Sequence, residues 1–185
     1  MFHKANVASL LRQISEREIQ QVGRFREHVR THHSLEVAAL ENLPEDVDPE
    51  YAELASADVQ LLDDVLGLSD ELAIVALYRV VELETKALFR FLAKKSASRE
   101  LSSVANLRER LAKDFGIDLD KIPFYPSVNE LRLLNNAIKH EKVAGSELVK
   151  YGWTEGGILV GLDGAFERIA PDVPRYLEAL ASQKA

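Results

Sequence analysis

Apolar residues recur at helical spacing along most of this chain, and this periodicity constrains the fold more than any other feature of the sequence. Leu10, Ile14 and Phe25 follow it, and we expect one long helix or two joined helices over residues 5–41. Glycine (9 residues) and proline (6 residues) are too scarce for a turn-rich β-sandwich or a disordered chain. The sequence therefore predicts an all-α fold.

Glycine and capping residues divide the middle of the chain into further predicted helices. A helix over residues 50–66 is expected to stop at Gly67. Ser69 is expected to cap the next helix, which runs to about Lys95 and is apolar on almost every face. Such a helix belongs at the centre of a bundle.

Three more helices are predicted in the C-terminal half, over residues 101–115, 127–141 and 171–182. The second of them opens with a capping-box pattern, because Glu130 follows Ser127 by three positions.

Residues 145–163 depart from the helical pattern, because they are rich in glycine and contain the strand-like run 158–160. We expect a small hairpin here, packed onto the bundle by Trp153. A phosphate-binding loop is disfavoured, since the Gly-Lys-Ser/Thr ending of such loops is missing.

The expected architecture is an up-and-down bundle of five or six helices in a single domain, residues 1–185. Its expected parts are an N-terminal helical arm (1–42), a bundle core (50–145), and the Gly-rich excursion with a C-terminal helix (146–185).

Composition excludes several classes of protein. The chain has no cysteine, which excludes disulfides, thiolate nucleophiles, Cys-based zinc sites and iron–sulfur clusters. No apolar run approaches the roughly 18 residues of a membrane span, and the N-terminus lacks the apolar core of a secretory signal. We therefore expect a cytoplasmic protein with no membrane partner.

Charge is segregated along the chain. The net charge of −7 argues against nucleic acid, but residues 31–78 contain twelve acids and no lysine or arginine, so the rest of the chain is basic on balance. The acidic segment suits a basic protein partner, and the remainder can still hold a phosphate-binding cleft.

The helix expected over residues 127–141 carries the most informative pattern. At 100° per residue, Leu131, Leu134 and Ile138 form its core face. The other side presents three amides, two cations and an imidazole, with no carboxylate: Asn129, Arg132, Asn135, Asn136, Lys139 and His140. These groups suit a phosphodiester beside a hydroxyl. In the alternative interpretation, the amides bond to a neighbouring loop and the imidazole lies at a helix C-terminus, where a cation is favoured.

The string LRLLNNAIKH, residues 131–140, resembles the signature of the HEPN superfamily, in which an Arg and a polar residue precede a His on one helix. Asn136 and His140 match the polar residue and the His. Asn135 occupies the Arg position, and the nearest arginine, Arg132, lies one turn earlier. The resemblance implies an all-α bundle, a homodimer in which two motifs face one cleft, and metal-independent ribonuclease activity of toxin–antitoxin or phage-defence systems.

The resemblance and the residue chemistry together predict one mechanism. His140 acts as general base or acid, Asn136 orients the His or the phosphate, and Arg132 stabilises charge on the phosphoryl oxygens. The substrate is RNA, and no metal or cofactor is required. The residues expected to bind substrate beside these three are Lys139, Asn135 and Asn129.

A second class of function remains open, a non-catalytic helical interaction module such as a dimerising adaptor or an antitoxin-like partner. Leu54, Leu61 and Val65 form an exposed stripe that suits a homodimer seam.

Histidines on the N-terminal helix raise the question of a metal site. His28, His32 and Glu36 recur at intervals of four residues, but the glutamate of an H-E-x-x-H motif is missing and the adjacent His33 points elsewhere. We interpret this cluster as a solvated helix end.

Overall fold

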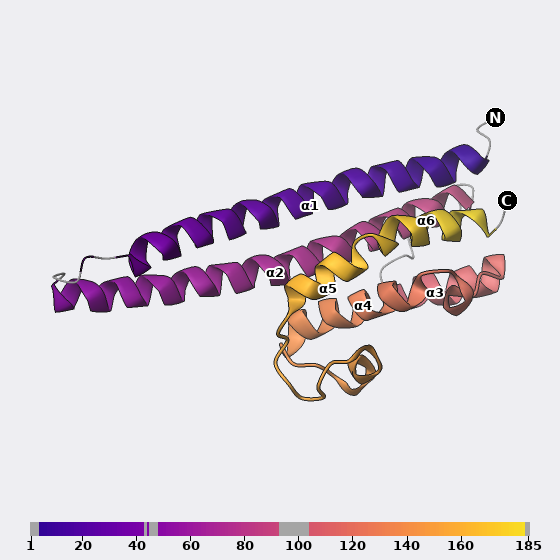
Figure 1. Ribbon diagram of the computed structural model, residues 1–185. Helices are drawn as coiled ribbons and strands as arrows, with labels where there is room; N and C mark the ends of the chain where they lie inside the picture. The colour runs from indigo at the N-terminus through magenta and orange to yellow at the C-terminus, as the bar shows by residue number, and fades with distance from the viewer. Residues whose placement is uncertain (1–3, 43, 45–47, 93–103, 184–185) are drawn as a thin grey trace.

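The computed structural model describes residues 4–42, 44, 48–92 and 104–183, and it is all-α (Figure 1). The predicted fold class, a helical bundle, is confirmed. The elements in chain order are α1 (Lys4–Glu41), α2 (Pro49–Leu92), α3 (Val104–Phe115), η1 (Leu119–Lys121), α4 (Tyr125–His140), η2 (Ser146–Tyr151), α5 (Leu162–Ile169) and α6 (Asp172–Ser182), where η marks a 3-10 helix. None of the helices in these ranges has an apolar stretch long enough to cross a bilayer.

The two longest helices, α1 and α2, form an antiparallel hairpin (Figure 1). Two contacts fix their register: Arg26 Nε lies 2.9 Å from Asp70 Oδ1, and His33 Nε2 lies 2.7 Å from Asp63 Oδ1. The half of the hairpin that holds the end of α1 and the start of α2 projects beyond the other helices.

The predicted break at Gly67 is wrong, because α2 continues through it as one helix of 44 residues. Ser69 does not cap a new helix. It is buried, and its hydroxyl donates to the carbonyl of Leu66 inside α2. Packing against α1 on one side outweighs the roughly 1 kcal/mol by which a glycine disfavours a helix interior.

The core lies where α4, α5 and α6 pack onto the C-terminal half of α2 and the N-terminal half of α1. Its largest fully buried side chains come from the five helices α2 to α6 and from the 3-10 helix η2: Ile74, Leu77, Phe89, Leu107, Leu111, Leu131, Leu134, Leu148, Ile169, Tyr176, Leu177 and Leu180. This packing fixes which face of α4 is turned inward.

The predicted capping box at the start of α4 is also wrong. The helix begins at Tyr125, after Phe124 in a left-handed conformation (φ 65°). Ser127 Oγ instead donates to Asp172 Oδ2 of α6 at 2.7 Å. The Glu130 carboxylate is buried and accepts hydrogen bonds from Arg168 and from Trp153 Nε1.

The Gly-rich segment contains one antiparallel bridge, between Val143 and Ile158, rather than a full hairpin. Trp153 is half-buried and packs against the core, as expected. The sequence interpretation missed α5, which starts directly after Gly161. Gly161 takes a left-handed conformation (φ 78°) that favours glycine, and this turns the chain into the helix.

Candidate functional site

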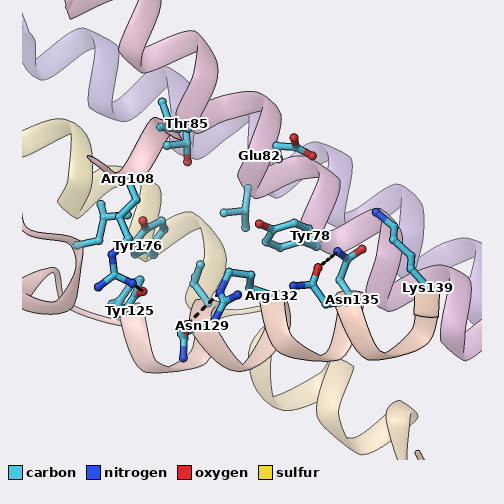
Figure 2. Close-up of a pocket in the computed structure, with 15 residues that line it drawn as sticks. Tyr78, Glu82, Thr85, Arg108, Tyr125, Asn129, Arg132, Asn135, Lys139 and Tyr176 are labelled. Carbon is cyan, nitrogen blue, oxygen red and sulfur yellow. Dashed lines mark hydrogen bonds between the residues drawn. The ribbon is translucent and has the colours of Figure 1, made fainter. Parts of the chain in front are cut away.

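A cleft of about 530 Å³ opens between α2, α3 and α4 (Figure 2). Its walls come from all three helices, with η1 and α6 at one end. The lining residues are Tyr78, Val81, Glu82, Thr85, Leu107, Arg108, Leu119, Tyr125, Val128, Asn129, Arg132, Asn135, Asn136, Lys139 and Tyr176.

The cleft gathers five of the six candidate residues of α4. Leu131 and Leu134 are fully buried in the core, and this orientation turns the polar stripe of the helix along the cleft. Asn135 is buried on the cleft wall, whereas Asn136 and Lys139 are exposed at its rim. Arg132 and Asn135, which the sequence places about 60° apart around the helix, line the same cleft.

Arg132 is held by a short hydrogen-bond chain. Its Nε donates to Asn129 Oδ1 at 3.1 Å, and Asn129 Nδ2 donates to Tyr151 Oη at 2.9 Å. No carboxylate among the described residues forms an ion pair with Arg132 or Lys139. Arginine forks bind phosphate and carboxylate oxygens in pairs, so the arrangement leaves a fixed, unneutralised guanidinium in the cleft.

Two buried polar atoms in the cleft wall lack partners in the described part of the chain. They are Thr85 Oγ1 on α2 and Asn135 Oδ1 on α4. Thr85 is 5% exposed and Asn135 is 2% exposed. Figure 2 shows Asn135 directed from α4 toward α2 beside Tyr78, with Thr85 farther along α2, toward Arg108 and Tyr176. An unpaired buried polar group costs about 1–3 kcal/mol, so this pair is the kind of feature that a bound polar ligand would stabilise.

Tyrosine hydroxyls form the other polar component of the cleft. Burial raises the pKa of Tyr78 to about 12 and raises the pKa values of Tyr125 and Tyr176. All three rings therefore stay neutral at physiological pH. Tyr176 is fully buried, whereas Tyr78 and Tyr125 can donate hydrogen bonds or stack against a planar group in the cleft. Arg108 Nη1 donates to Tyr125 Oη at 2.8 Å.

The balance of charge in the cleft is positive. Arg108, Arg132 and Lys139 contribute three cations, and Arg108 is paired with Asp120 outside the cleft lining. The one carboxylate among the lining residues, Glu82, is bound by Lys86 Nζ at 2.5 Å. An anion with hydrogen-bond donors and acceptors fits this environment better than a cation does.

His140 lies outside the main cleft. It is exposed at the C-terminal end of α4 and lines a neighbouring hollow of about 320 Å³ together with Arg132 and Asn136. The same hollow contains Glu141 and Glu147. Arg132 and Asn136 therefore form a ridge, with the cleft on one side and the imidazole on the other.

The N-terminal histidines do not converge with three or more ligating side chains in the described residues. His33 contacts Asp63, and His32 Nε2 lies 3.9 Å from Glu36 Oε1 on the solvated side of α1.

Several polar residues that line the cleft were not predicted from the sequence, among them Tyr78, Thr85, Arg108 and Tyr125. Tyr78 and Thr85, with Glu82 between them, recur at intervals of four and three residues on the otherwise apolar central part of α2, and this polar stripe was a usable signal. Arg108 and Tyr125 reach the cleft from α3 and from the start of α4, and nothing local in the sequence indicates that they meet.

Comparison of the chain with protein-family models, with curated proteins and with solved structures finds no match in any of the three. The functional argument therefore rests on the residues of the cleft.

Proposed function

We propose that this protein binds RNA in the cleft between α2, α3 and α4 and cleaves it without a metal ion. The observation that carries the proposal is the pairing of unneutralised Arg132 and Lys139 with three amide side chains and two unpartnered buried polar atoms in one cleft. Cations bind phosphate oxygens, and amide side chains form hydrogen bonds with groups that both donate and accept them, such as bases and ribose hydroxyls.

The chemistry of the walls indicates how RNA lies there. A phosphate sits against Arg132 and Lys139, at the rim. A base or ribose enters between α2 and α4, where the neutral rings of Tyr78 and Tyr125 stack and the polar atoms of Thr85 and Asn135 find partners. Stacking of single-stranded bases on aromatic rings is a common mode of RNA recognition.

Cleavage takes place across the ridge. A phosphodiester on the ridge contacts Arg132 and Asn136 and has His140 on its far side. His140 takes the proton of the ribose 2′-hydroxyl, whose oxygen then attacks the adjacent phosphorus, and the leaving oxygen receives a proton from solvent. The products are a cyclic phosphate and a free hydroxyl end. Arg132 stabilises the charge that develops on the phosphoryl oxygens.

The chain's resemblance to the HEPN superfamily supports the same proposal and adds a setting, a cytoplasmic toxin–antitoxin or phage-defence system. In that setting, induction of the wild-type protein arrests growth and induction of His140→Ala does not.

A cleavage assay tests the catalytic part. Single-stranded and structured RNA are incubated in a metal chelator with the wild type, with His140→Ala and with the control His32→Ala. The proposal predicts cyclic-phosphate products from the wild type and the control, and none from His140→Ala. Equal cleavage by all three proteins excludes His140 as the catalytic group, and RNA binding without cleavage by the wild type reduces the function to binding.

A non-catalytic interaction module is the second candidate. The observation in its favour is a long row of exposed apolar side chains on α1 and α2. An adaptor of this kind is expected to bind a second copy or a basic partner while leaving RNA intact.

A further inference from the structure

Exposed apolar side chains gather on one side of the α1–α2 hairpin. Five of them on α2 and three on α1 directly precede a buried or half-buried residue. A residue that precedes another by one position in an α-helix points about 100° away from it around the helix axis. Because α1 and α2 are antiparallel, this offset directs the exposed apolar residues of both helices to the same side of the hairpin. We call this side the uncovered face, and its residues are Leu10, Ile14, Phe25, Leu54, Leu61, Val65, Leu68 and Leu72.

Two further observations support a single face. Leu10 and Ile14 of α1 line one apolar groove of about 720 Å³ with Ala87 and Phe91 of α2. On the other side of the hairpin lie α5 and α6, held by the ion pairs of Arg26 with Glu167 and of Arg12 with Glu178. The two sides therefore differ in what packs against them, and Leu68 and Leu72 stay 51% and 49% exposed.

The charge distribution along the hairpin selects the occupant of this face. The end near the α1–α2 connection, residues 31–41 and 49–71, has nine acids and no lysine or arginine. The other end, residues 4–30 and 72–92, has nine lysines and arginines and five acids. A second copy in the antiparallel orientation lays each acidic end over a basic end. A parallel copy would lay acid over acid, which is unfavourable.

We propose that the uncovered face binds a second copy of this chain, hairpin against hairpin and antiparallel, so that α2 packs on α2. Two exposed charges on the face of α2 set the register. Asp58 and Arg79 are equally far in sequence from the point between Leu68 and Ser69. A two-fold axis at that point places Asp58 of each copy beside Arg79 of the other.

The area of the face is sufficient for a stable dimer. In this register about forty residues of α2 overlap, which corresponds to about 60 Å of helix. Two adjacent helices are about 20 Å wide. The footprint of each copy therefore exceeds the roughly 800 Å² per partner that a standard specific interface buries.

Sedimentation equilibrium of the full chain tests the proposal. The wild type is expected to be a dimer. Leu68→Glu is expected to raise the dissociation constant of the dimer at least about tenfold, because each copy would bury the new charge at the centre of the interface. The control Ile158→Glu changes a side chain that is 73% exposed and lies off the face, and it is expected to leave the dimer unchanged. Circular dichroism checks that all variants remain helical.

A charge exchange tests the register. Asp58→Arg and Arg79→Asp are each expected to weaken the dimer, since each change sets like charges together, and the double variant is expected to restore it. If the wild type is monomeric at the highest soluble concentration, the proposal is overturned, and the partner of the uncovered face is then a different protein. Indifference of the dimer to Leu68→Glu overturns it as well, and failure of the double variant to recover overturns the antiparallel register.

Discussion

Unpaired polar atoms are the clearest mark of function at the scale of single residues. Thr85 and Asn135 are buried on opposite walls of the cleft, and neither Thr85 Oγ1 nor Asn135 Oδ1 has a partner in the described residues. A protein selected for stability alone would bury apolar atoms there. Groups that reduce stability in the free state and bind a ligand are a common compromise at functional sites.

Replacing Thr85 by valine separates these two effects. The change removes the unpaired hydroxyl and keeps the shape of the side chain, so we expect the free energy of unfolding to rise by about 1 kcal/mol. The affinity for RNA is expected to fall, because the ligand loses a partner. Chemical denaturation and RNA titration of Thr85→Val measure both quantities. A loss of stability with unchanged RNA affinity would show that the hydroxyl serves the fold instead.

The raised pKa of Tyr78 predicts how the stability of the protein depends on pH in the alkaline range. Its pKa rises from 10.0 to about 12 because burial disfavours the phenolate. Folding therefore favours the protonated ring, and this contribution is fully present below pH 10 and is lost as the pH rises toward 12. We expect the unfolding free energy of the wild type to fall over this range and that of Tyr78→Phe to fall less. Parallel curves for the two proteins would contradict the assigned pKa.

At the scale of elements, continuity of α2 determines the geometry of the molecule. The helix carries the cleft wall at Tyr78 and Thr85 and, on another side, the uncovered face at Leu61 and Leu68. A break near Gly67 would separate these two surfaces. Because the helix is unbroken, the cleft and the proposed dimer interface belong to one rigid element.

Replacing Gly67 by alanine tests that continuity. Gly67 is exposed in the interior of α2, and a Cβ atom there would meet nothing within 4 Å. We expect Gly67→Ala to raise the free energy of unfolding by about 1 kcal/mol, the difference in helix propensity. Thermal unfolding measures the change. A decrease in stability would indicate that the chain needs a glycine conformation at this position and that two helices meet there.

The sequence predicts the long helices well, because their apolar periodicity extends over many turns. Local signals failed where tertiary contacts outweigh them. Gly67 resembles a helix stop, but the packing of α2 on α1 carries the helix through it. Glu130 resembles a capping residue, but its carboxylate is buried and pairs with the half-exposed Arg168. Helix α5 has only eight residues, follows Gly161 and contains Gly164. Its apolar pattern is therefore too short to identify a helix from the sequence.

The candidate site was predicted in part for a similar reason. Asn129, Arg132 and Asn135 share one face of one helix, so their spacing alone places them together. The position of His140 beyond the ridge follows from where α4 ends, and Arg108 comes from another helix. Contacts between distant segments of this kind have no local sequence signal.

At the scale of the whole molecule, segregation of charge makes the proposed RNA-binding cleft compatible with an acidic protein. The net charge of −7 is dominated by the acids of residues 31–78, most of which lie on the projecting half of the hairpin. The cleft lies at the other end of α2 and carries an excess of cations. A dimer of the proposed geometry would also cover part of the acidic surface with basic side chains of the second copy.

The salt dependence of RNA affinity tests the central claim most directly. Each phosphate contact contributes about one unit to the slope of log affinity against log salt. We predict that Arg132→Ala binds RNA more weakly than the wild type and with a slope smaller by about one. Arg24→Ala, which removes an exposed arginine of α1 outside the cleft, is expected to match the wild type. Equal slopes for the wild type and Arg132→Ala, or the absence of salt-dependent binding by the wild type, would contradict an RNA-binding cleft centred on Arg132.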